Sequence, residues 1–145
     1  MDNDMLTEAL GDCVLSGNKI FVDSKKIRDT LVLIKEKFDY TMLKSITAVD
    51  AGDEVELIYD LYSIDNEESV IVSTKVQLET ESISDIFGSA QADENEIHDM
   101  FGIMFIGNSD LKRLYMPENW NGYPLRKDYV QDDTRLVWND SDDNA

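Results

Sequence analysis

The chain has 145 residues, which suits one domain with a single modest hydrophobic core. Its 31 acidic and 13 basic residues give a formal net charge of −18 at pH 7. Because such a surface repels phosphate groups and anionic lipids, we expect no nucleic-acid binding and no direct attachment to a membrane surface.

The single cysteine, Cys13, excludes an internal disulfide and any cluster held by cysteines alone, and we predict that it is buried as a small side chain. No apolar run approaches the roughly 20 residues that cross a bilayer, and the first residues are acidic, unlike a secretory signal. We therefore expect a cytoplasmic chain whose contact with a membrane runs only through partners.

The N-terminal part of the chain predicts a short helix, two short strands and a longer helix. The expected ranges are 6–10 for the short helix and 14–15 and 20–22 for the strands, which flank a turn at residues 16–18. Four apolar residues of the longer helix share one face, because they recur at spacings of four, three and four: Ile27, Leu31, Ile34 and Phe38. Asp23 or Ser24 can cap this helix.

Three strands are predicted next, at residues 43–49, 55–62 and 70–78, because these stretches are rich in β-branched and aromatic residues. Polar residues between them are typical of antiparallel hairpins. Alternate residues of the second and third strands are largely apolar and predict one buried face. The opposite face still carries Ile58, Tyr62 and Ile71, which we interpret as a face partly covered by a partner.

Beyond the sheet, the sequence predicts two further helices and a strand. Ser82 and Asp85 resemble a capping box, which would begin a short helix that Gly88 ends. A second helix is predicted at residues 90–100, before Gly102, and a strand at 103–106. These elements predict an α+β fold: a single domain with an antiparallel or mixed sheet packed by helices.

Residues 111–129 mix Pro117, Gly122 and Pro124 with aromatic residues. Because proline and glycine interrupt regular hydrogen bonding, we expect an extended, partner-binding segment that is ordered by contacts across a surface. The domain is expected to span residues 1–129. Residues 130–145 are expected to be an acidic, flexible tail, in which residues 136–138 could provide an anchor.

A search for a reactive site finds little. No glycine-rich phosphate-binding loop is present, and one histidine, His98, is too few for most nucleophile–base pairs or zinc sites. We interpret His98 as a helix-surface residue, with a proton relay as the alternative. Glu94, Glu96 and Asp99 could hold a divalent cation, but the five-residue spacing of Glu94 and Asp99 does not stack them on one helix face. Pairing of these acids with arginines or with the helix N-terminus is the favoured interpretation.

One stretch of the sequence is far more specific than these patterns. Residues 94–103 read Glu-Asn-Glu-Ile-His-Asp-Met-Phe-Gly-Ile, and residues 122–129 read Gly-Tyr-Pro-Leu-Arg-Lys-Asp-Tyr. Between them stand Asp-Leu-Lys-Arg-Leu at 110–114 and Met-Pro-Glu-Asn-Trp at 116–120. Together these motifs resemble the signature of the 30 kDa (C-type) subunit family of respiratory complex I, which includes the corresponding small subunit of energy-converting, membrane-bound nickel–iron hydrogenases. The resemblance covers about residues 6–129.

The chain departs from the family pattern at a few positions. Asn95 replaces the central arginine of a Glu-Arg-Glu motif, and Asp93 stands near a frequent tryptophan. Asn108-Ser109 replaces His-Pro, and Tyr123 replaces a frequent histidine or phenylalanine. These departures favour a subunit of the hydrogenase type over one from a conventional quinone-linked complex I.

The resemblance implies a non-catalytic structural and assembly subunit in the peripheral arm of a membrane-bound, ion-translocating oxidoreductase, at the cytoplasmic face of the membrane. It implies no cofactor in this chain; iron–sulfur clusters, and in a hydrogenase a nickel–iron centre, would lie in partner subunits. The implied partners are a large hydrogenase or 49 kDa-type subunit, iron–sulfur subunits and membrane subunits.

The partner interface expected on this basis consists of Glu94, Glu96, Asp99, Phe101, Trp120, Tyr123, Pro124, Arg126, Lys127, Asp128 and Tyr129. Its aromatic residues would be anchors, and Arg126 and Lys127 would fix the orientation by charge pairing. On this view, Arg126→Ala should loosen the complex without changing the fold of the domain.

Three other functions stay open at this point. The same role in a quinone-reducing complex of the NADH dehydrogenase type is the first alternative, and a free-standing acidic protein-binding module is the second. An independent enzyme with a carboxylate pair, Glu94 and Glu96, is a weak third, because residues two apart on a helix point to different sides.

Overall fold

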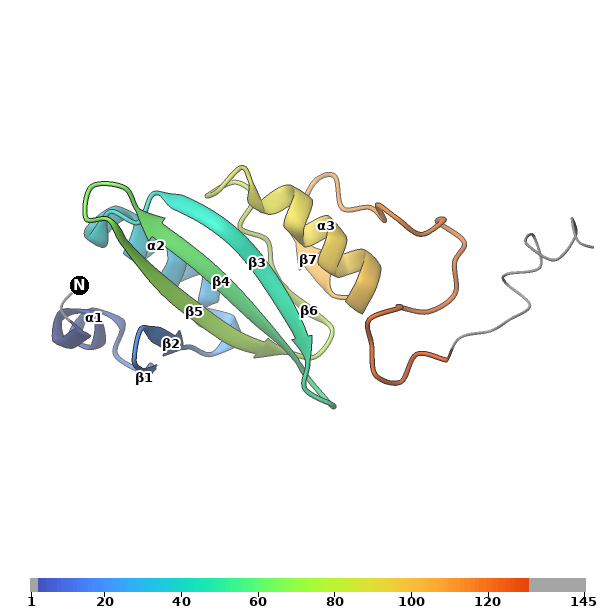
Figure 1. Ribbon diagram of the computed structural model, residues 1–145, viewed down its shortest axis with the longest axis horizontal. Coiled ribbons are helices and arrows are strands. Elements are labelled where there is room, and N and C mark those ends of the chain that lie inside the picture. The colour runs from blue at the N-terminus through green and yellow to red at the C-terminus, as the bar shows by residue number, and fades with distance from the viewer. Residues whose placement is uncertain (1–2, 131–145) are drawn as a thin grey trace, which may run out of the picture.

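Residues 3–130 are described by a computed structural model, in which three α-helices accompany a five-stranded and a two-stranded sheet (Figure 1). The elements in chain order are α1 (Asn3–Leu10), β1 (Val14–Ser16), β2 (Lys19–Phe21), the 3₁₀-helix η1 (Ser24–Lys26), α2 (Ile27–Phe38), β3 (Met42–Asp50), β4 (Val55–Ser63), β5 (Glu68–Val76), β6 (Glu79–Glu81), α3 (Ala90–Phe101) and β7 (Met104–Ile106). The α+β prediction is confirmed.

The large sheet has the strand order β1-β2-β5-β4-β3. The three long strands β3, β4 and β5 form the two predicted antiparallel hairpins. Strand β2 lies parallel to β5, because the chain passes through α2 and the two hairpins before it returns beside β2. The sheet is therefore mixed, with the N-terminal strands at one edge and β3 at the other.

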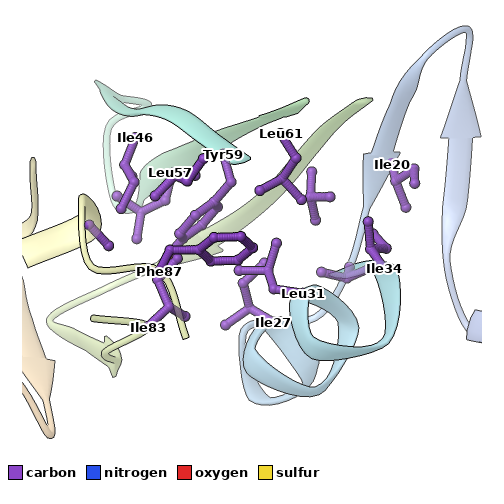
Figure 2. Packing of buried hydrophobic residues seen from close by; sticks show 14 of the residues in the cluster. Ile20, Ile27, Leu31, Ile34, Ile46, Leu57, Tyr59, Leu61, Ile83 and Phe87 are labelled. Carbon is purple, nitrogen blue, oxygen red and sulfur yellow. The ribbon is translucent and has the colours of Figure 1, made fainter. Parts of the chain in front are cut away.

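The hydrophobic core lies on one face of this sheet, under α2 (Figure 2). Alternate residues of β4 are fully buried from Val55 to Leu61, as the sequence pattern predicts. Ile27, Leu31 and Ile34 of α2 are completely buried and face Tyr59 and Leu61, whereas Phe38 is only partly buried. Burial of each such aliphatic side chain contributes roughly 1.5–3 kcal/mol.

Helix α2 has a defined C-terminal cap, whereas its own N-cap residue, Lys26, makes no side-chain capping hydrogen bond. The Asp23 carboxylate accepts a hydrogen bond of 2.9 Å from the backbone N–H of Lys25, so it caps the short η1 turn that leads into α2. Asp39 ends α2 in the left-handed conformation, at φ 61°.

The predicted short helix before Gly88 is wrong: residues 84–86 form only a turn. Ser82 Oγ accepts the backbone N–H of Ser84, two residues on, instead of that of Asp85. The Asp85 carboxylate, which a capping box would need, is held by both terminal nitrogens of Arg28 in α2. The turn therefore bridges β6 and α3 as part of the core, with Ile83 and Phe87 buried.

Two further predictions need correction. The third long strand ends at Val76, and residues 79–81 form a separate strand, β6, that pairs in parallel with β7. Cys13 is partly buried at the margin of the core rather than buried, and its partial burial, together with the nearby Asp12, raises the pKa of its thiol. Within residues 3–130, no helix is long and apolar enough to span a bilayer.

Candidate partner interface

The segment that follows β7 contains no helix or strand up to residue 130, yet it is tied to the domain at fixed points. We call residues 111–129 the C-terminal segment. It leaves the domain beside α3 and returns towards the end of that helix, where the backbone N–H of Leu125 donates a 3.0 Å hydrogen bond to the carbonyl of Met100 (Figure 1). Hydrogen bonds at a few points hold this segment, which has no regular structure, in one conformation.

The first fixed point is the carboxylate of Asp99, a fully buried residue of α3. One oxygen accepts a 2.6 Å hydrogen bond from Arg113 Nε. The other accepts three consecutive backbone N–H groups, those of residues 114, 115 and 116, at 3.1, 2.7 and 3.1 Å. Burial by itself would raise the pKa of Asp99, but the Arg113 guanidinium and the backbone donors outweigh it and hold this pKa below its ordinary value.

The Arg113 guanidinium also closes the loop that begins at Asp99. Its terminal nitrogens donate to the carbonyls of Trp120 and Gly122, both at 2.8 Å, and to the carbonyl of Asp99 at 3.0 Å. The same group lies 5.2 Å from the centre of the Tyr123 ring. One arginine therefore joins the end of α3, at Asp99, to the backbone at residues 120 and 122.

The second fixed point is Asp50, at the end of β3. One of its oxygens accepts the backbone N–H of Lys127 at 2.8 Å and lies 3.5 Å from Arg126 Nε, while the other accepts the N–H of Gly52 at 2.9 Å. The two backbone donors, Lys127 first, and the nearby guanidinium hold the pKa of Asp50 below its ordinary value, against the opposing effect of burial. The end of the C-terminal segment is thus bound to the sheet.

Two glycines allow the segment to pack closely. Gly102 ends α3 with φ 78°, and a Cβ atom there would lie only 2.6 Å from the Tyr123 ring. Gly122 has φ 100°, and a Cβ atom there would lie 3.1 Å from the ring of Tyr129. Both positions combine a left-handed backbone with an aromatic neighbour, so a side chain is disfavoured for two reasons.

Glu94 serves a third, separate network on the other side of α3. Its fully buried carboxylate accepts hydrogen bonds from Ser82 Oγ and the Ile83 N–H, both at 2.8 Å, and from Asn108 Nδ2 at 2.9 Å. Burial raises the pKa of Glu94, although these hydrogen bonds oppose the shift. Asn95, the next residue, contacts Asn108 at 3.4 Å and donates to the Asp110 carbonyl at 3.2 Å. Two of the positions that depart from the family pattern are therefore in contact.

The predicted interface residues divide into three groups in the structure. Glu94 and Asp99 are buried, and their carboxylates are bound within the domain. The half-buried members are Phe101, Trp120, Pro124, Arg126 and Tyr129, and the exposed members are Glu96, Tyr123, Lys127 and Asp128. A partner cannot reach Glu94 or Asp99 unless these hydrogen bonds break.

The contacts of Arg126 change how its substitution is interpreted. Because the guanidinium lies near Asp50, Arg126→Ala would weaken an internal ion pair as well as any contact with a partner. The predicted pairing of helix acids with arginine is confirmed for Asp99.

Among residues 3–130, no cluster of three or more metal-ligating side chains occurs, and His98 Nδ1 lies 3.0 Å from the Ile103 carbonyl.

Sequence reasoning missed Asp50, Arg113 and Leu78 as parts of this region. Leu78, Phe101, Tyr123, Tyr129 and Val130 line a hollow of about 450 Å³ between the start of β6 and the C-terminal segment. Arg113 lies in a stretch that resembles the family pattern, so that motif offered a signal for it. Nothing in the sequence indicated that Leu78 lies beside residues 123–130.

The part of the sequence that forms these contacts matches a known protein family. The family model of the respiratory-chain NADH dehydrogenase 30 kDa subunit matches residues 20–135. The chain belongs to this family. The matched range includes both fixed points of the C-terminal segment and the Glu94 network, so the features described above lie within the region that defines the 30 kDa family.

Individual relatives in this family are parts of larger assemblies. The chain is 34 % identical over 116 residues to the C/D-type NADH-quinone oxidoreductase subunit of Phocaeicola vulgatus, an alignment that covers 77 % of this chain but only 22 % of that longer protein. It is 32 % identical over 117 residues to the C-type NADH-quinone oxidoreductase subunit of Geobacter sulfurreducens, covering 76 % of this chain and 72 % of the relative.

Solved structures agree with this assignment. A chain of the membrane-bound sulfane sulfur reductase, an archaeal respiratory membrane complex, superposes with a TM-score of 0.77 at 27 % identity, covering 97 % of this chain and 89 % of that one. A trypsin-resistant fragment of Nqo5 shares the fold, with a TM-score of 0.59 at 20 % identity, covering 77 % of this chain and all of the fragment. Members of the 30 kDa family thus occur in complex I and in complex I-like membrane-bound complexes.

Proposed function

We propose that this chain is a non-catalytic structural and assembly subunit in the peripheral arm of a membrane-bound, ion-translocating oxidoreductase, where its C-terminal segment docks on the large, 49 kDa-type subunit. The observation that carries the proposal is a contrast within this segment. Its polar groups are bound internally by Asp99, Arg113 and Asp50, while several of its apolar side chains face solvent.

The exposed apolar side chains indicate what the segment contacts. Leu114, Tyr115 and Leu125 are 43, 67 and 55 % exposed. Apolar groups held outside the core in a fixed conformation suit a protein interface, because a preordered segment loses less conformational entropy on binding. The apolar residues and Tyr123, more than Arg126, would then supply the binding energy.

Redox chemistry is assigned to the partners. We propose that iron–sulfur clusters lie in neighbouring subunits, and that this chain contributes shape and contacts rather than a cofactor site. The proposal also places the chain at the cytoplasmic face of the membrane, reached through partner subunits.

Three kinds of complex are consistent with this role. The departures from the family pattern favour an energy-converting nickel–iron hydrogenase, the similarity to a chain of the sulfane sulfur reductase favours a complex of that kind, and the NADH-quinone oxidoreductase relatives favour a quinone-linked complex. A free-standing acidic binding module is the remaining candidate, for which the C-terminal segment would be a loop on its own core.

The test is affinity purification of the tagged full-length chain from gently solubilised native membranes, followed by mass spectrometry and a metal assay. We expect co-purification of a large subunit, iron–sulfur subunits and membrane subunits. Nickel in stoichiometric amount would identify a hydrogenase, and its absence would favour the other two complexes. A chain that emerges alone and monomeric from the soluble fraction would contradict the proposal and support the free-standing module.

A further inference from the structure

The two-stranded sheet of β6 and β7 has an exposed face that the proposed function does not use. The strands pair in parallel, with Glu79 beside Met104 and Glu81 beside Ile106. In a parallel pair, residues in register point to the same side of the sheet. Thr80 and Phe105 point to the other side and are buried, so the four remaining side chains form one outward face.

This outward face, which we call the β6–β7 face, alternates two acidic and two apolar side chains. Met104 and Ile106 are 45 and 54 % exposed. Glu79 and Glu81 are both exposed, and within residues 3–130 no hydrogen bond or ion pair occupies either carboxylate. Arg28, whose charge interacts with that of Glu81, donates its hydrogen bonds to Asp85 and to the Ser82 carbonyl instead.

The β6–β7 face continues into the region proposed above for docking. The backbone N–H of Met104 donates a 2.9 Å hydrogen bond to the carbonyl of Leu78, and Leu78 lines the hollow next to Tyr123 and Val130. Leu78, the residue that precedes Glu79, therefore belongs both to the edge of the hollow and to the backbone ladder beside β7.

We propose that the β6–β7 face is a second docking surface, occupied by an amphipathic segment of a partner subunit that presents apolar side chains flanked by Lys or Arg. The apolar side chains would cover Met104 and Ile106, and the cations would pair with Glu79 and Glu81. The charge pattern selects this occupant, because an acidic or purely apolar segment would leave the two carboxylates repelled or unpaired. The proposal rests on the proposed function, since it requires an assembled complex.

The proposed contact of Met104 and Ile106 with a partner is tested by measuring how firmly partner subunits are retained. The double variant Met104→Ser and Ile106→Ser is compared with a matched pair on β3, Met42→Ser and Val49→Ser, which are 48 and 46 % exposed. Each tagged chain is purified from native membranes, and the retention of partner subunits during washing is measured. We expect about tenfold faster loss of partners for the β6–β7 pair and wild-type retention for the control. Melting temperatures of the free chains check that both variants fold.

The proposed pairing of Glu79 and Glu81 with cations of a partner is tested by charge reversal and by cross-linking. Glu79→Lys with Glu81→Lys should reduce retention about tenfold, whereas Glu8→Lys with Glu36→Lys, on exposed positions of the helices, should not. In the wild-type complex, a zero-length carbodiimide reagent should join Glu79 or Glu81 to a lysine in a partner segment with apolar neighbours.

The outcomes separate the two proposals. If the wild-type chain assembles and the serine pair is retained equally well, or cross-links are absent from both glutamates, the β6–β7 face is not a docking surface and the proposed function stands. If the wild-type chain itself emerges alone, the proposed function fails and this inference fails with it.

Discussion

The central sheet and the C-terminal segment reach a fixed conformation by different physical means. Strands β4 and β5 are held by a full backbone ladder and by an uninterrupted row of buried side chains. Residues 111–129 have neither, and they depend instead on two carboxylates, Asp99 and Asp50, that gather backbone N–H groups and arginines. A few well-placed ionic hydrogen bonds can therefore order a segment that apolar burial does not.

The largest expected effect lies in the sheet. Leu57→Ala removes a completely buried side chain and should lower the free energy of unfolding by about 2–5 kcal/mol, because it leaves a cavity. Chemical denaturation measures this change, with Val49→Ala, at an exposed position of β3, as the control. An effect no larger than that of the control would mean that the sheet is not the cooperative centre of the domain.

The matching change in the C-terminal segment is Asp99→Asn. It keeps the shape of the side chain but removes its charge, and whichever way the new amide is turned, an NH₂ group replaces an oxygen that accepts protein N–H donors. We expect a loss of about 2–4 kcal/mol, confined to the segment. Amide exchange at residues 114–116 should then accelerate by roughly 30- to 1000-fold, while exchange in β4 changes little.

The control for Asp99→Asn is Glu96→Gln, an exposed carboxylate on the same helix. Equal acceleration of exchange in β4 and in residues 114–116 would contradict the division into two regions. It would indicate that the segment and the sheet unfold as one unit.

A smaller effect is expected from Gly102→Ala. The left-handed backbone disfavours a side chain, and the added Cβ would meet the Tyr123 ring, so we expect a cost of roughly 1–2 kcal/mol. The displacement of Tyr123 should appear in its aromatic NMR signals. Gly11→Ala, which is also left-handed but has no neighbour within 4 Å, separates backbone strain from the clash.

The smallest effect is a pH dependence that differs in sign between the two fixed points of the C-terminal segment and the Glu94 network. The pKa values of Asp99 and Asp50 are lowered, so their contribution is complete above the ordinary value of 3.8 and is lost as the pH falls through the lowered values. The pKa of Glu94 is raised above 4.5, so its contribution grows as the pH falls through that raised value. Exchange at residues 114–116 should therefore stay constant down to about pH 4 after correction for intrinsic rates, whereas protection near Ile83 should increase. Loosening of the segment already at pH 5–6 would contradict this account.

The sequence predicts the regular elements well, because their signals are local. The spacing of Ile27, Leu31 and Ile34 and the alternation in β4 both follow from element geometry alone. The three-residue strand β6 was missed, since Glu-Thr-Glu carries no strand pattern. The false helix before Gly88 arose because Arg28, 57 residues away in the sequence, holds the side chain of Asp85.

The candidate interface, like the fold, could be predicted from the sequence only in part. Aromatic and proline residues indicated an extended segment on composition alone, and its lack of regular structure up to residue 130 is confirmed. The roles of Asp99 and Asp50 depend on hydrogen bonds across 14 and 77 residues, which no local pattern encodes. The assignment of Glu94, Asp99 and Arg126 to a partner interface followed from the family resemblance, which did not reveal the contacts that all three make within the domain. The predicted flexible tail and its anchor at residues 136–138 lie outside the described residues.

The position of α3 has a consequence for how the sheet can pair with other molecules. Strand β3 is a nine-residue edge strand, the kind that can recruit a strand from another molecule and start aggregation. Here its register shifts between Leu43 and Ser45, the Ile46 N–H donates to the Asp93 carboxylate, and the Leu43 carbonyl accepts from Ser89 Oγ. The opposite edge, β1, has only three residues. Strand addition along β3 is therefore disfavoured once the domain has folded, which limits self-association through this edge.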